Sequence, residues 1–91
     1  MAINVTTESK SVANQTIQGT FQIWNTLVIT GLTANADNVI AHKLPKKPSF
    51  VNLRPGANGL WGEVSVDGTN ITIHVGSGGA TSGRIDTMHE T

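Results

Sequence analysis

Three histidines and several acids are the residues of this chain whose types could hold a metal ion. A catalytic zinc ion commonly takes three protein ligands, often histidines. The histidines lie on separate segments and share no ligand-like spacing, so we expect no metal site. The spacing favours an exposed pair of His74 and Glu63 on one predicted hairpin instead. The ligands considered are His42, His74, His89, Asp37, Glu63 and Asp86.

The glycine-rich segment 76–83 is the second feature that could bind a ligand, in this case a phosphate. A Walker-type loop requires a lysine after its last glycine, and this segment contains no lysine. Thr81 stands where a dinucleotide-binding fingerprint needs glycine or alanine, and no helix is predicted to follow. The segment therefore indicates a flexible connection or a long hairpin loop.

Nucleophilic catalysis finds no support in the remaining motifs. The chain has no cysteine, which excludes a thiolate nucleophile and a cysteine-based zinc site. It also lacks the Gly-x-Ser-x-Gly elbow of the α/β hydrolases. Most of the six acids fall near predicted turns or chain ends, which does not favour the carboxylate pair of a glycosidase. We expect no enzymatic activity and no cofactor.

The two tryptophans are better candidates for a functional surface, because alternation places each of them on an otherwise polar face. Tryptophan is enriched where a partner buries a surface, and it also stacks on sugar rings. Three interpretations stay open: a second layer within the domain, a subunit interface, and a glycan platform. The interface would comprise Trp24, Lys43, Lys46, Lys47, Arg54 and Trp61. The glycan platform would comprise Trp61, Glu63, Asn70 and His74.

The charge composition limits the classes of partner that we expect this chain to bind. Six basic and six acidic residues leave no net charge, which argues against nucleic-acid binding by electrostatics. Lys43, Lys46 and Lys47 hold half of the basic residues, an asymmetry that could steer one subunit onto another or simply mark a solvated loop. No apolar run approaches the length of a membrane span, and the N-terminus does not resemble a signal peptide. We therefore expect no membrane partner and synthesis in a cytoplasm.

Residues 60–75 are predicted to form a β-hairpin. Alternating runs flank Asp67-Gly68, a dipeptide typical of a two-residue type I′ turn in which both residues have positive φ. That turn would fix the register and place Trp61 opposite His74 on the polar face. The expected apolar face contains Leu60, Gly62, Val64, Val66, Thr69, Ile71, Ile73 and Val75.

The rest of the chain also predicts strands and turns rather than helices. Residues 1–14 are polar and are predicted to be an arm, either frayed or ordered on a neighbouring subunit. Residues 15–91 are predicted to be one antiparallel β-sandwich or barrel-like domain of about seven or eight strands. The expected strands of this domain, besides the hairpin, are 17–30, 39–42, 49–54 and 84–88.

Two motifs resemble a pattern found in small β-rich virion proteins of tailed bacteriophages. One runs from Ile29 to Val51 and contains an Ala-His-x-Leu turn followed by a proline; the other is the turn 67–70 with the alternating strand 71–75. The resemblance covers roughly residues 28–76, although Pro45 replaces the glycine that usually follows the leucine. It implies a structural module of a head or tail and carries no catalytic residue.

The function expected from this resemblance is that of a phage virion structural protein, most concretely a capsid decoration or cement protein. Such a protein would stabilise the head by oligomeric contacts across capsomers, with a homotrimer favoured. Its partners would be the major capsid protein or another virion protein. It would be made in the cytoplasm of the host bacterium and located in the virion. The alternative is a glycan- or receptor-binding module of a head spike or tail fibre.

Overall fold

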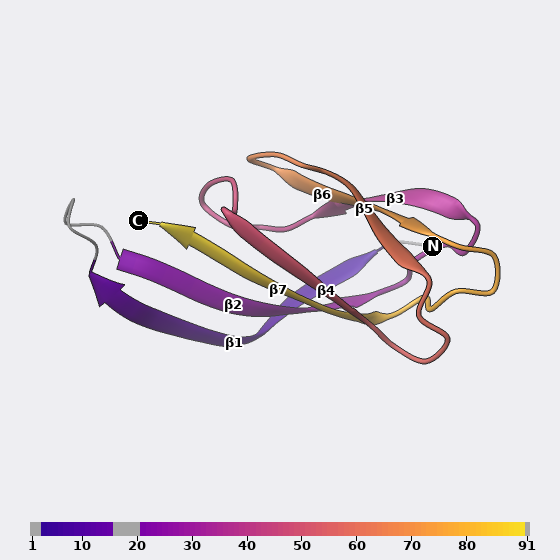
Figure 1. Ribbon diagram of the computed structural model, residues 1–91, viewed down its shortest axis with the longest axis horizontal. Coiled ribbons are helices and arrows are strands. Elements are labelled where there is room, and N and C mark those ends of the chain that lie inside the picture. The colour runs from indigo at the N-terminus through magenta and orange to yellow at the C-terminus, as the bar shows by residue number, and fades with distance from the viewer. Residues whose placement is uncertain (1–2, 16–20, 91) are drawn as a thin grey trace.

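Two antiparallel β-sheets packed face to face make up the residues that a computed structural model describes, namely 3–15 and 21–90 (Figure 1). This part of the chain contains seven strands and no helix, which confirms the predicted all-β sandwich. The four-stranded sheet has the order β1-β2-β7-β4, and the three-stranded sheet has the order β3-β6-β5. The strands are β1 (Asn4–Gln15), β2 (Phe21–Thr30), β3 (Ala36–Ala41), β4 (Phe50–Pro55), β5 (Trp61–Val66), β6 (Asn70–Val75) and β7 (Gly83–Glu90).

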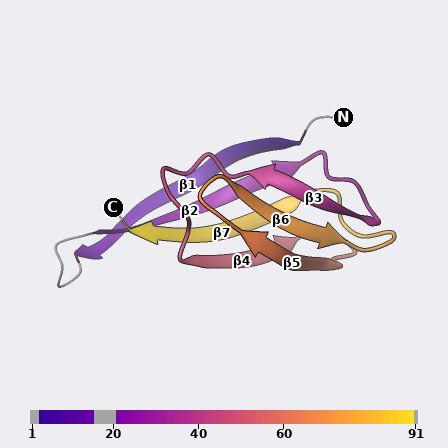
Figure 2. The same ribbon diagram turned by 90° about the horizontal axis from the view of Figure 1, so that it is seen from above.

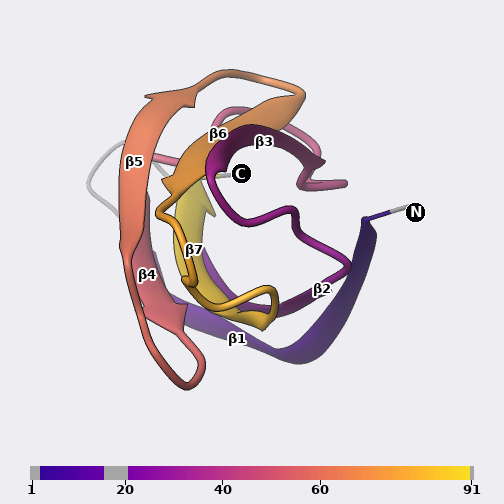
Figure 3. The ribbon, with the colours of Figure 1, turned by 90° about the vertical axis from the view of Figure 1, so that its right-hand side faces the viewer.

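The core lies between the inner faces of the two sheets, which curve around it (Figure 3). Strict alternation in β2 and β6 turns every second side chain inward, as the period of two in a strand requires. Each fully buried aliphatic side chain contributes about 1.5–3 kcal/mol to folding. The fully buried apolar residues are Leu27, Ile29, Ile40, Ile71, Ile73, Val75 and Ile85.

The four-stranded sheet is longer than the sheet that covers it. Strand β1 has 12 residues and β2 has 10, whereas β3, β5 and β6 have 6 each. The molecule measures 44 × 20 × 20 Å, and the ends of β1, β2 and β7 extend beyond the shorter sheet (Figure 2). We call this extended part the overhang. No strand of the three-stranded sheet covers its inner face.

The hairpin 60–75 is present, but its predicted register is wrong. Trp61 pairs with Val75, and His74 pairs with Gly62. Neither Asp67 nor Gly68 has a positive φ, so the type I′ turn does not form. Instead the Asp67 carboxylate accepts the backbone N–H groups of Thr69 and Asn70, each at 2.7 Å, and closes a longer turn. A bulge between Glu63 and Ser65 then changes the pairing by one residue, which puts Glu63 and Trp61 on the same face as Val66.

This correction moves Trp61 from the polar face to the core side. The indole is half-buried, packs against the hydrophobic core, and donates a hydrogen bond from Nε1 to the Ala80 carbonyl at 2.8 Å. Val64, expected on the apolar face, lies at the bulge and is exposed. Leu60, also expected on that face, is exposed as well.

The segment expected to be a separate arm forms strand β1 instead. It pairs with β2 along most of its length, and Val5 belongs to the hydrophobic core. Its polar composition reflects its place at the sheet edge, where few side chains meet the core. The long strand predicted over 17–30 is present from Phe21, and residues 17–20 lie outside the described part. Strands β3 and β7 are longer than predicted, and β4 matches its expected range within one residue.

Candidate functional site

The outer face of the four-stranded sheet carries the most organised set of side chains in the described part of the chain. Strand register arranges them in three rows that run across β2, β7 and β4. The aromatic row is Trp24, Met88 and Phe50; the polar row is Thr26, Asp86 and Asn52; the arginine row is Val28, Arg84 and Arg54. The edge strand β1 adds Ser11 beside Trp24 and Ser9 beside Thr26.

Two rings meet above the central strand in the aromatic row. Trp24 on β2 and Phe50 on β4 both flank Met88 on β7, and their ring centroids lie 5.5 Å apart at an interplanar angle of 58°. Tilted aromatic pairs at this distance are attractive beyond their buried area. Phe50 remains 43% exposed although its ring is held by the pair. The aromatic row is therefore a partly exposed apolar surface whose ring pair is already formed in the free protein.

The polar row is held together by the Asp86 carboxylate. Oδ1 accepts hydrogen bonds from Thr26 Oγ1 at 3.0 Å and Arg54 Nη2 at 2.8 Å. Oδ2 accepts from Asn52 Nδ2 at 3.2 Å and from Arg54 Nε at 2.7 Å. Partial burial raises the pKa of Asp86, but these hydrogen bonds outweigh it and hold the pKa below its usual range. Two parallel bonds fix the plane of the Arg54 guanidinium.

The face as a whole is balanced in charge. Arg84 forms an ion pair with Glu8 at 2.8 Å, and the hydrogen bond from Arg84 lowers the pKa of that carboxyl group. Each arginine of the row is thus matched by one acid. A ligand of this face meets fixed dipoles and aromatic rings rather than an excess of either sign.

A hollow of about 260 Å³ lies between the aromatic and polar rows. Apolar rings form part of its lining, and hydroxyl groups and a carboxylate form the rest. It is lined by Ser9, Ser11, Trp24, Asn25, Thr26, Phe50 and Asp86. The structure thus provides a small amphipathic site on an outer sheet face.

The six predicted interface residues fall in three separate places. Trp24 and Arg54 lie on the outer face just described, whereas Trp61 faces the core. The three lysines lie in segment 42–49, which joins β3 to β4. Lys43 donates to the Val5 carbonyl at 3.3 Å and so ties this segment to β1. The side chains of Lys46 and Lys47 are exposed.

The predicted glycan platform is not assembled as one surface. His74 lies on the outer face of the three-stranded sheet and pairs with Asp37 at 2.8 Å, not with Glu63. Asn70 stands at the hairpin turn, and Trp61 is turned to the core. Across residues 3–15 and 21–90, no three His, Asp, Glu or Cys side chains gather in a way that could hold a metal ion.

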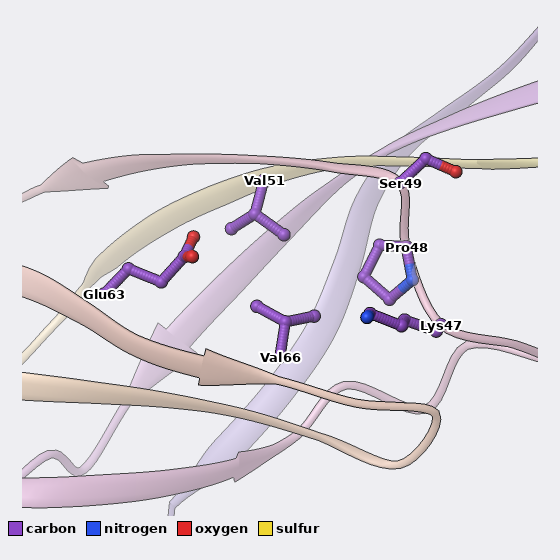
Figure 4. A pocket seen from close by; sticks show the side chains of 6 residues that line it. All are labelled: Lys47, Pro48, Ser49, Val51, Glu63 and Val66. Carbon is purple, nitrogen blue, oxygen red and sulfur yellow. The ribbon is translucent and has the colours of Figure 1, made fainter.

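Glu63 lines a second hollow, of about 270 Å³, where β4 and β5 diverge (Figure 4). Val51 and Val66 form its apolar walls, and the Lys47 side chain lies near its rim. Glu63 shares the inward face of β5 with Val66 because the bulge lies between them. The hollow marks the open edge of the sandwich, between two strands that do not pair.

The inner face of the overhang combines exposed apolar groups with lysines. By register, Val12 and Phe21 share this face with the buried Ile23, and they are 60% and 41% exposed. Burial of His89 lowers the pKa of its imidazole, and the charges of Lys10 and Lys46 lower it further. By register Lys10 lies on this face, opposite Asn25. We call Val12, Phe21, Lys10 and Lys46, together with Lys47 as the chain neighbour of Lys46, the lysine end.

Buried polar side chains lie beneath the lysine end. Asn25 and Thr87 oppose each other on β2 and β7, and Asn25 Nδ2, Thr87 Oγ1 and His89 Nδ1 are buried without a protein hydrogen-bond partner. In contrast to these three atoms, both ring nitrogens of His42 have hydrogen-bond partners. Its Nδ1 accepts the Leu44 N–H at 3.0 Å, so Nε2 carries the proton and donates to the Asp67 carbonyl at 2.9 Å.

Sequence reasoning missed the partners that complete the outer face, above all Phe50 and Met88. A residue's face can be predicted from alternation, but the order β2-β7-β4 joins segments far apart in the chain. Asp86 was considered only as a metal ligand. Asp86 lies opposite Thr26 and Asn52 because β7 pairs with β2 and β4, and these pairings cannot be predicted from the sequence of β7 alone.

Comparisons with known proteins identify no relative. No protein-family model matches the chain, and neither the curated proteins nor the solved structures include one that is similar to it. In the described residues there is also no helix of the length and apolar character that a membrane crossing needs.

Proposed function

We propose that this protein is a structural component of a tailed-phage virion, a capsid decoration protein that docks as an oligomer across capsomers. The virion setting is supported by the resemblance of segments 29–51 and 67–75 to small virion proteins of these phages. The assembly role is supported by the lysine end. The proposed partner is an acidic surface of the major capsid protein, and the proposed oligomer is a homotrimer.

The lysine end is the observation that carries the assembly role. Val12 and Phe21 are large apolar side chains that stay exposed on the inner face of the overhang. Lys10 shares the inner face of β1 with Val12, and Lys46 is an exposed lysine close enough to His89 to lower the pKa of its imidazole. Apolar groups within a charged rim are typical of protein interfaces, in which the rim sets orientation and association rate. A basic rim favours an acidic partner.

Two of the four edge strands, β4 and β5, favour contact through side chains over strand addition. Strand β5 has a bulge at Val64 and an inward-pointing charge at Glu63, two features that disfavour pairing with another chain. Strand β4 begins two residues after Pro48 and ends at Pro55, and these prolines limit its extension as an edge. Strand addition is therefore disfavoured at β4 and β5, and contact there would use side chains.

Binding to expanded empty capsids of the encoding phage tests this function. The Lys46→Gln and Lys47→Gln double variant removes two positive charges from the lysine end. Two rim charges at about 0.5–1 kcal/mol each predict roughly 5- to 30-fold weaker binding. The control, Ser77→Asp with Thr81→Asp, changes the charge equally at exposed positions in loop 76–82, at the other end of the sandwich. It should bind like wild type.

The solution mass of the free protein is measured alongside. An oligomer that sediments with capsids and responds only to the lysine variant is the expected result. A monomer that does not bind capsids, or equal losses in the lysine variant and the control, would overturn the decoration role.

A further inference from the structure

The hollow on the outer face of the four-stranded sheet has the composition of a ligand site. Trp24 and Phe50 supply an aromatic wall whose rings fix each other 5.5 Å apart. Ser9, Ser11 and Thr26 supply hydroxyl groups, and Asp86 supplies a carboxylate. Sites for small molecules are concave, combine apolar surface with a few placed polar groups, and are largely formed in advance. This hollow meets each of these conditions.

The size of the hollow limits its ligand to one small ring. Pockets for drug-sized ligands span roughly 300–1,000 Å³, and this one has about 260 Å³. It is also open on one side, since it lies on a sheet face. A single ring of a longer molecule could enter it while the rest of that molecule extends along the face.

The charge balance of the site selects a neutral ligand. The carboxylate of Asp86 is paired with Arg54, and Glu8 is paired with Arg84. A cationic ligand would have to displace Arg54 from two hydrogen bonds, and an anionic ligand would meet the Asp86 carboxylate. A purely apolar ligand would leave the hydroxyl groups without partners.

We infer that this hollow binds one pyranose ring of a neutral glycan. One face of a pyranose presents C–H groups that pack on an aromatic ring, and its edge presents hydroxyl groups. Trp24 would take the C–H face, while Ser9 and Ser11 exchange hydrogen bonds with the ring hydroxyls. The network around Asp86 holds Thr26 in place, so the polar wall is ordered before binding.

The sugar site is separate from the lysine end. Trp24 projects from the outer face of β2, whereas Val12 and Phe21 belong to the inner face of the same sheet. A decoration protein docked through its lysine end would leave the outer face open to solvent. The inference goes beyond the proposed function and does not depend on it.

Titration of the whole protein with neutral methyl pyranosides, followed by NMR, tests the inference. The chain has two tryptophans, so two indole N–H signals report on the outer face and on the core side. A ligand of this size is expected to bind with a dissociation constant on the order of 1 mM. The Trp24 signal should shift in a saturable manner with at least one of the gluco, galacto, manno and N-acetylglucosamine forms. The Trp61 signal should stay in place.

Variants assign the shift to the hollow. Ser9→Ala with Ser11→Ala should weaken binding about 10-fold, because two hydrogen bonds to the ring are lost. Trp24→Phe lacks the indole signal and is followed through the backbone amide signals of β2; it should retain weaker binding through its smaller ring. Val28→Ala, on the same strand and face but outside the hollow, should bind like wild type.

Three results would overturn the inference. The first is that the Trp24 indole signal does not shift with any neutral pyranoside. The second is that the Trp24 and Trp61 signals shift equally. The third is that the Trp24 signal changes only when capsids are added. The last result would assign the outer face to the capsid instead. The Lys46→Gln and Lys47→Gln protein should still bind sugar, so failure of the decoration role and failure of the sugar site are distinguishable.

Discussion

Replacing Asp86 with Asn should destabilise the protein by removing the acceptor that holds the outer face together. The carboxylate accepts four hydrogen bonds from Arg54, Asn52 and Thr26, and an amide of the same shape would turn an N–H group toward some of these donors. The Arg54 and Asp86 side chains are 50% and 24% exposed, so solvent weakens the ion pair. We estimate about 0.5–1 kcal/mol for the pair and a similar amount for the remaining hydrogen bonds.

The expected loss of about 1–2 kcal/mol corresponds to a fall in Tm of roughly 4–16 °C for a domain of this size. Urea unfolding at neutral pH and calorimetry measure the two quantities. Asp37→Asn is the matched control, because Asp37 is paired with His74 on an exposed surface and should change stability little.

The pH dependence of the Asp86→Asn effect separates charge from packing. The pKa of Asp86 is lowered in the folded protein, so its contribution is complete above the unfolded value of about 3.9 and is lost as pH falls through the folded value. The difference between wild type and variant should therefore be constant near neutrality and shrink below about pH 4. A difference that persists in strong acid, or one no larger than that of Asp37→Asn, would refute the reasoning.

Three further predictions concern the interior. The pKa of His89 is lowered by burial and by nearby Lys10, Lys46 and His42. The free energy of unfolding should therefore fall as pH drops below about 6.5 toward the folded pKa. In a His89→Gln variant the midpoint of urea unfolding should change less with pH across that window. Gly83→Ala should lower stability by about 1–3 kcal/mol in urea unfolding, because a Cβ there would lie 2.7 Å from the Trp61 ring and from a backbone oxygen. Trp61→Phe should cost about 1–3 kcal/mol, since the Ala80 carbonyl loses its 2.8 Å donor, and a stability equal to wild type would contradict the core position.

The fold class could be predicted because alternation is a local property of the sequence. Strand β2 shows it over its whole length, and so does β6, the second strand of the hairpin, whereas a bulge interrupts it in β5. Register could not be predicted with the same success, because the Asp67 side chain captured two backbone N–H groups and lengthened the turn. The longer turn left Val66 facing inward, and the bulge between Glu63 and Ser65 then turned Trp61 to the core side.

The site was less accessible to prediction than the fold. Trp24 was identified as a surface residue, but its neighbour Phe50 reaches it only because β7 lies between β2 and β4. Strand β1 was missed because its inward side chains are few, and an edge strand needs only Val5 and backbone pairing with β2 to be held. The Trp24–Phe50 contact and the position of β1 both depend on which strands become neighbours. Pairing between segments far apart in the chain cannot be predicted from the sequence of either segment alone.

Lysine-reactive footprinting of the capsid-bound protein tests the docking role most directly. Mass spectrometry would compare the labelling of each lysine in the free protein and in the protein bound to expanded empty capsids. The decoration role predicts that Lys10, Lys46 and Lys47 become protected on the capsid. Unchanged labelling of these three lysines, or no binding to the capsid, would contradict it.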